Sequence, residues 1–69
     1  MKYIVVELQT DAGGTVGNNV FAYDGQNAAE AKYHTILAAA AVSEVPEHAA
    51  VLMNSRGELL ESRCYEHAE

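Results

Sequence analysis

The stretch AKYHTILAAAAVS, residues 31–43, constrains the fold more than any other part of this chain. Its four consecutive alanines, Ala38 to Ala41, favour a helix but supply little bulk for a hydrophobic core. The chain has 69 residues, and a domain of this size buries only about 60% of the surface that its unfolded form exposes. Such a core contributes roughly 3–5 kcal/mol, so domains this small usually need a disulfide, a metal ion or a partner subunit.

The alanine run lies in the C-terminal half of a predicted helix, which extends from about residue 28 to residue 42. Asn27 is a suitable N-cap residue, and Glu30 three positions later forms with it a pair of capping-box type. Pro46 forbids continuation of the helix and favours an extended conformation for the residue before it. Apolar residues recur at helical spacing on the face expected to meet the core, namely Ala29, Tyr33, Ile36, Leu37 and Ala40.

Four strands are predicted, two on each side of the helix, because apolar segments with strand-like patterning alternate with turn sequences. They span residues 2–9, 19–24, 48–54 and 58–66. The segments 11–19 and 54–57 gather glycine, asparagine, aspartate and serine, which favour turns. We therefore expect an α+β fold in one domain, residues 1–69: ββαββ, a four-stranded antiparallel sheet with one helix packed on one face. The sequence leaves the strand order open.

Both faces of the predicted sheet are partly apolar. In the first strand, Ile4, Val6 and Leu8 share one face at the two-residue period of a strand. One helix can cover only one face of a four-stranded sheet. The second face still carries apolar residues in some register, namely Val5, Phe21, Tyr23, Leu59 and Tyr65. Because exposed apolar patches of this kind usually mark interaction surfaces, we expect a homodimer or a higher assembly.

Three of the alanines, Ala38, Ala39 and Ala41, fall on the flanks of the helix, away from its core stripe. Helix propensity alone explains them, since exposed alanine costs little. The alternative is that small side chains let a second body pack closely against the helix. Assembly can therefore use the open sheet face or the alanine flank, and the expected interface residues are Ala38, Ala39, Ala41, Val5, Phe21, Tyr23 and Tyr65.

The charge balance argues against nucleic-acid binding. Ten acidic and four basic residues give a formal net charge of −6, whereas affinity for a phosphate backbone comes from lysine and arginine. An acidic surface serves solubility or faces a basic partner protein. The sequence has no apolar run of about 20 residues that would span a membrane and no signal-peptide pattern. We expect a cytoplasmic protein, with no direct contact to DNA, RNA or membrane.

No residue pattern predicts catalysis or a cofactor. Cys64 and His67 form a C-x-x-H pair, but a zinc site needs two closely spaced pairs, and residues three apart on a strand point to opposite faces. A Cys64 nucleophile would need a base such as His34 or His48, which the spacing does not identify. The glycines of residues 13–17 lack the phosphate-loop pattern. We expect a protein that is not an enzyme and that holds no metal.

The few cations are the candidate ligand-binding residues. Lys32 and His34 flank Tyr33 on the helix, and either of them, with an arginine of the second hairpin, can line an intersubunit groove for an anion. The alternative is that Lys32 extends along the helix surface and that His34 is solvated. The residues expected to bind a ligand are Lys32, His34, His48, Arg56 and Arg63.

Four parts of the chain carry distinctive motifs, namely KYHTILAAAAVS at residues 32–43, HAAVLM at 48–53, Gly57 and CYEH at 64–67. In these motifs the chain resembles short uncharacterised proteins encoded in phages and prophages of gut Firmicutes. The resemblance covers most of the chain but implies only a phage context, and with it the host bacterial cytosol, because its motifs carry no established chemistry.

A phage context leaves three hypotheses. The first is an oligomeric binding protein that counteracts a host defence system by capturing a nucleotide signal or a defence protein. The second is an acidic mimic of nucleic acid that blocks a nuclease, and the third is a structural or assembly adaptor of the phage particle. The second requires a continuous acidic stripe, formed by Glu7, Asp24, Glu44, Glu47, Glu58 and Glu61.

Overall fold

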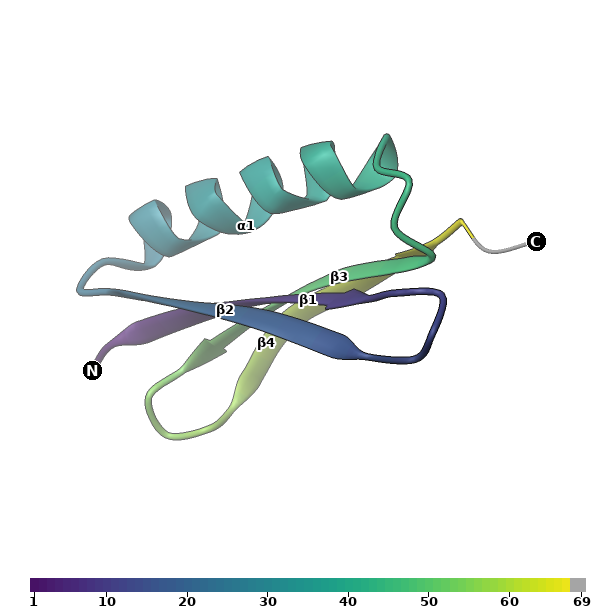
Figure 1. Cartoon of the computed structure of the whole chain (residues 1–69). Coiled ribbons are helices and arrows are strands. Elements are labelled where there is room, and N and C mark those ends of the chain that lie inside the picture. Colours follow the sequence, from purple (N-terminus) through teal and green to yellow (C-terminus); the bar gives the residue numbers. More distant parts are fainter. Residues whose placement is uncertain (68–69) are drawn as a thin grey trace.

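The computed structural model of the chain describes residues 1–67. Four strands and one helix follow each other in the predicted ββαββ order: β1 (Tyr3–Thr10), β2 (Val16–Tyr23), α1 (Gln26–Ala41), β3 (Glu47–Asn54) and β4 (Leu59–Glu66). The four strands form one antiparallel sheet with α1 across one of its faces (Figure 1). The expected fold class is thereby confirmed. Among residues 1–67, no helix combines the length and the apolar character needed to cross a bilayer.

The strands lie in the order β2-β1-β3-β4, so that β1 and β3 occupy the centre of the sheet. Val5 of β1 lies between Phe21 of β2 and Leu52 of β3. Both β2 and β3 run antiparallel to β1 and hence parallel to each other. Two parallel strands need a long crossover connection, and α1 supplies it.

The first hairpin loop is shorter than predicted, because β2 begins at Val16 rather than near residue 19. The Asp11 carboxylate accepts hydrogen bonds from the backbone N–H groups of Gly13 and Thr15, each at 2.9 Å. Gly14 has a φ of 88°, a conformation that glycine adopts without steric cost. These local bonds close the loop within residues 11–15.

The helix begins earlier than the predicted Asn27 cap. The N-cap is Gly25. Among the described residues, no side chain caps this end of the helix with a hydrogen bond. The carbonyl of Gly25 already accepts a bond from the N–H of Ala29 at 3.3 Å, which places Asn27 inside the first turn. The predicted pairing of Asn27 with Glu30 is therefore wrong.

The core lies between α1 and the sheet. Its buried residues are Val5, Ala29, Tyr33, Ile36, Ala50 and Leu52, and the half-buried Tyr3, Phe21, Tyr23 and Leu37 pack against them. The predicted core stripe of the helix is confirmed, with Leu37 at its edge. Val5 and Leu52 are fully buried, and the helix adds bulk through Tyr33 and Ile36, which are 3% and 4% exposed.

The assignment of the two sheet faces from the sequence is wrong for four residues. Val5, Phe21, Tyr23 and Tyr65 lie on the helix side of the sheet rather than on its open side. The open side instead carries the neighbouring positions of β1, which include Val6. The reason is physical: both faces are apolar, so the two-residue period by itself does not tell which one the helix covers.

Alanine substitutions at Ile36 and Leu37 should lower the free energy of unfolding by different amounts, because Ile36 is buried and Leu37 is half-buried. Ile36 is only 4% exposed, so Ile36→Ala should cost about 2–5 kcal/mol of unfolding free energy. Leu37→Ala should cost less, because Leu37 lies at the edge of the core. Urea denaturation followed by circular dichroism measures both. Equal losses for the two variants would contradict this division of the stripe.

Candidate ligand groove between the helix and the edge strand

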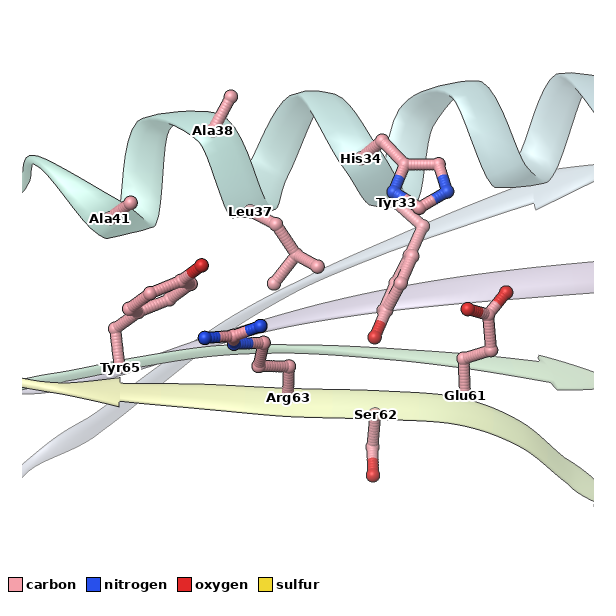
Figure 2. A pocket seen from close by; sticks show the side chains of 9 residues that line it. All are labelled: Tyr33, His34, Leu37, Ala38, Ala41, Glu61, Ser62, Arg63 and Tyr65. Atoms are coloured by element: carbon pink, nitrogen blue, oxygen red, sulfur yellow. The ribbon is translucent and has the colours of Figure 1, made fainter.

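A groove lies between α1 and the edge strand β4, because the helix packs mainly on β3 and β1 and least on β4. Its volume is about 600 Å³, within the range of small-molecule sites. Figure 2 shows it from close by. The helix contributes Tyr33, His34, Leu37, Ala38 and Ala41, and the strand contributes Glu61, Ser62, Arg63 and Tyr65.

Two of the four alanines form the helix wall of the groove. Ala38 and Ala41 are exposed and line it, whereas Ala39 is exposed outside it and Ala40 is buried on the sheet. With larger side chains, positions 38 and 41 would fill part of the space between α1 and β4. The small residues therefore leave room beside the helix, and in the chain described here this room lies between α1 and β4. The packing of a second subunit against these alanines stays a prediction.

The strand wall is polar, because residues 61, 63 and 65 project from the helix side of β4. The guanidinium carbon of Arg63 lies 4.6 Å from the centre of the Tyr65 ring, a cation–π contact. Figure 2 shows the Arg63 guanidinium and the Glu61 carboxylate both pointing towards the helix, whereas Ser62 points away. The groove thus offers one permanent cation, one carboxylate and an aromatic face.

Tyr33 and His34 bring further polar groups from the helix. Their rings are 5.3 Å apart in an edge-to-face arrangement. Burial raises the pKa of the Tyr33 hydroxyl, and the Glu61 carboxylate adds to this effect. Tyr33 is therefore a neutral group at physiological pH. Its hydroxyl points towards β4 between Glu61 and Arg63 (Figure 2).

His67 joins the helix wall and the strand wall at one end of the groove. Its Nε2–H donates to the carbonyl oxygen of Ala40 at 2.8 Å, and its backbone N–H donates to Pro46 at 2.7 Å. The imidazole stacks on the Tyr65 ring with a centroid distance of 6.3 Å and an interplanar angle of 4°. These contacts hold the C-terminal part of β4 against the end of α1.

The structure brings two of the five predicted ligand residues, His34 and Arg63, together in the groove. Lys32 lies elsewhere on the helix, with its Nζ atom 4.2 Å from the centre of the Phe21 ring. Arg56 lies in the β3–β4 turn, and His48 is buried in the sheet. Within one chain, Lys32, Arg56 and His48 do not converge with these two residues, because they project from different parts of the fold. A role for them in a groove between subunits stays a prediction.

Sequence reasoning missed the roles of Tyr33, Glu61 and Tyr65 in this groove. Tyr33 was expected only as a core residue, and Tyr65 as an interface residue. The alternation of Glu61, Arg63 and Tyr65 was a usable signal, because residues two apart on a strand share one face. What the sequence did not reveal is that α1 leaves this edge of the sheet partly uncovered.

His48 takes part in a polar chain with Glu7 and Ser43. Its Nε2 lies 2.7 Å from a carboxylate oxygen of Glu7, and its Nδ1 lies 3.1 Å from the Ser43 hydroxyl. An ionised carboxylate only accepts, so His48 donates through Nε2–H. Burial would raise the pKa of Glu7, but hydrogen bonds from His48, Asn19 and Gln9 and the charge of His48 outweigh this and lower it.

The order Glu7–His48–Ser43 matches the connectivity of a hydrolase triad, but its surroundings do not support catalysis. Ser43 lies one residue beyond the C-cap Val42 of α1, at the end where the helix dipole is negative and would destabilise an oxyanion. Its backbone N–H is already bonded to the carbonyl of Ala40 at 3.3 Å. The groove does not include Ser43. We therefore interpret the three residues as a structural hydrogen-bond chain.

The remaining candidate chemistry is not assembled. Cys64 is exposed on β4 and faces away from the groove, as its neighbours Arg63 and Tyr65 point into it. Within residues 1–67, no group of three or more histidine, cysteine, aspartate or glutamate side chains is placed to hold a metal ion.

The acidic stripe required by a nucleic-acid mimic does not form. Glu47 lies opposite Thr10 at one end of the sheet, whereas Asp24 follows β2 at the other end. Glu7 is bonded to His48 on the helix side, and Lys2 donates to Asp24. The six carboxylates are thus spread over both ends of the sheet and over several elements.

Comparisons with protein-family models, with curated proteins and with solved structures found no match to this chain.

Replacing Glu7 by glutamine should remove part of the acid dependence of folding stability. The pKa of Glu7 in the folded chain lies below its ordinary value of 4.5. Ionised Glu7 therefore stabilises the fold above pH 4.5, and this contribution is lost as the pH falls through the lower folded value. Urea titrations from neutral pH to about pH 3 should show the difference in unfolding free energy between wild type and Glu7→Gln shrinking on acidification.

Asp24→Asn is the matched control. A hydrogen bond from Lys2 and the charge of Lys2 lower the pKa of Asp24 as well, but both side chains are largely exposed. Exposed pairs of this kind contribute little to stability, so the same titration should give a smaller pH-dependent difference. A larger effect at Asp24 than at Glu7 would contradict the assignment.

Proposed function

We propose that this chain is a small, non-enzymatic binding protein that takes an anionic nucleotide-type ligand in the groove between α1 and β4. In the phage setting implied by the sequence resemblance, capture of such a ligand would counteract a host defence system that signals with nucleotides. The working compartment is then the cytosol of the host bacterium.

One observation carries the proposal. In a chain with a net charge of −6, Arg63 and His34 line the same groove, together with the rings of Tyr33 and Tyr65. Arginine suits phosphate because its planar guanidinium donates two parallel hydrogen bonds. Aromatic faces suit a base, since stacking on them contributes about 1–3 kcal/mol per base.

The other groove residues fit the same ligand class. The Glu61 carboxylate accepts hydrogen bonds and suits the hydroxyls of a ribose. Leu37, Ala38 and Ala41 offer an apolar wall to the flat side of a base. Because the chain as a whole repels anions at long range, affinity has to come from these short-range contacts. Added salt screens that repulsion, so binding should not weaken steeply as ionic strength rises.

The phage adaptor and the capture of a defence protein stay alternatives without an observation that favours either over a small ligand. A nucleic-acid mimic is disfavoured by the scattered carboxylates. These alternatives differ from the proposal in one measurable respect, because they require neither Arg63 nor His34 to contact a nucleotide.

Calorimetric titration with adenosine monophosphate, cyclic adenosine monophosphate and ADP-ribose tests the proposal. At least one of these probes should bind, and Arg63→Ala should weaken it about tenfold or more, because a hydrogen bond to a charged group contributes roughly 1.5–3 kcal/mol. His34→Ala should weaken it less. Arg56→Ala is the matched control, since it removes the same charge from the β3–β4 turn, and its affinity should stay unchanged.

Two outcomes would overturn the proposal. One is the absence of heat with all three probes for a chain whose circular dichroism shows that it is folded. The other is an equal loss of affinity in Arg56→Ala and Arg63→Ala, which would show that only overall charge matters.

A further inference from the structure

The face of the sheet opposite α1, here called the uncovered face, is apolar through its centre. Its central residues are Ile4, Val6, Leu8, Val20, Val51 and Met53, as the strand register shows. Val6 lies between Val20 and Val51, and Ile4 lies beside Met53. Val20 is 61% exposed. Within the part of the chain that the structure describes, the helix lies on the other side of the sheet (Figure 1).

The distribution of charge on the strands is the reverse of what an isolated domain needs. An antiparallel sheet with one solvated face usually carries polar residues on that face. Here Glu7, Glu61 and Arg63 project on the helix side, while the charged strand residues of the uncovered face, among residues 1–67, are Glu47 and Glu66. These two are paired at one end of the sheet, so the centre of the uncovered face is uncharged.

We infer that a second copy of this chain covers the uncovered face, so that two sheets pack face to face. Four strands of eight residues each, at about 3.3 Å per residue and about 4.8 Å apart, give a footprint on the order of 500 Å². Two copies together would bury on the order of 1,000 Å², the lower bound for a specific interface.

Charge also favours a second copy over a basic partner. A basic partner would need carboxylates at the centre of the contact, and the centre of this face holds none among the described residues. In a twofold arrangement with the strands of the two copies running in opposite directions, the Glu47–Glu66 corner of each copy lies far from that of the other. Each acidic corner then stays at the rim, in water.

The pairing would give four layers, with a helix on each outer side and a shared core of two sheets. Sheets pack in this way about 10 Å apart. The shared core would bury the exposed Val20 and complete the burial of the half-buried apolar residues beside it, namely Ile4, Val6, Leu8, Val51 and Met53. The ligand groove lies on the helix side, so the pairing does not depend on the proposed ligand.

Light scattering after size-exclusion chromatography tests this inference. The wild-type chain of 7.4 kDa should elute at twice its mass at micromolar concentration, and Val51→Glu should elute as a folded monomer. Ala39→Glu introduces the same charge on the exposed outer side of α1 and should stay a dimer. A wild-type monomer at about 100 µM, or a monomer for Ala39→Glu with a dimer for Val51→Glu, would overturn the inference.

If Val51→Glu fails to fold, Val20→Glu replaces it in the mass measurement, because Val20 is exposed and its replacement leaves the helix-side core intact.

Cys64, opposite Ala49 on the uncovered face, gives an independent test of the dimer. Its reaction with a thiol reagent should slow as the wild-type concentration rises and should stay fast in Val20→Glu. A rate that is independent of concentration, with Val20→Glu a dimer, would overturn the inference. Arg63→Ala should leave the mass unchanged, which separates this test from that of ligand binding.

Discussion

The fold depends on one constraint, which is that a single helix shields the core of a four-stranded sheet. A helix of 16 residues is about 24 Å long and about 10 Å wide, whereas the sheet is roughly 19 Å wide. The helix therefore covers the centre of one face and leaves the edge at β4. Both the ligand groove and the uncovered face exist because one helix covers only part of the sheet.

The alanine run suits this geometry. Ala40 packs on the sheet without separating helix and strands, and Ala38 and Ala41 keep the side towards β4 open. Bulkier residues at these two positions would cover β4 better and strengthen the core, but they would also fill the groove. The composition of the helix thus leaves a cavity where larger residues would add to the core, which is consistent with the ligand binding that we propose.

The two surfaces that we propose to be functional lie on opposite sides of the sheet. Polar residues of β4 face the helix and equip the groove, and apolar residues of the same sheet face away from it. This alternation allows ligand binding and self-association to occupy the same strands without competing. It also fits the placement of Glu61 and Arg63 on the helix side of β4, where they line the groove instead of forming a solvated outer face.

The sequence by itself determined the element order, the helix stripe and the turns, because helical spacing, Pro46 and the turn residues near Asp11 and Gly57 act over a few neighbours. Arg63 was also recognisable as a scarce cation in an acidic chain, and His34 as a polar residue beside Tyr33 on an otherwise apolar helix. The strand order, the face covered by α1 and the partners of His48 were decided only by the tertiary structure. Those features depend on register between strands far apart in sequence, and a sheet that is apolar on both faces leaves that register without a local signal.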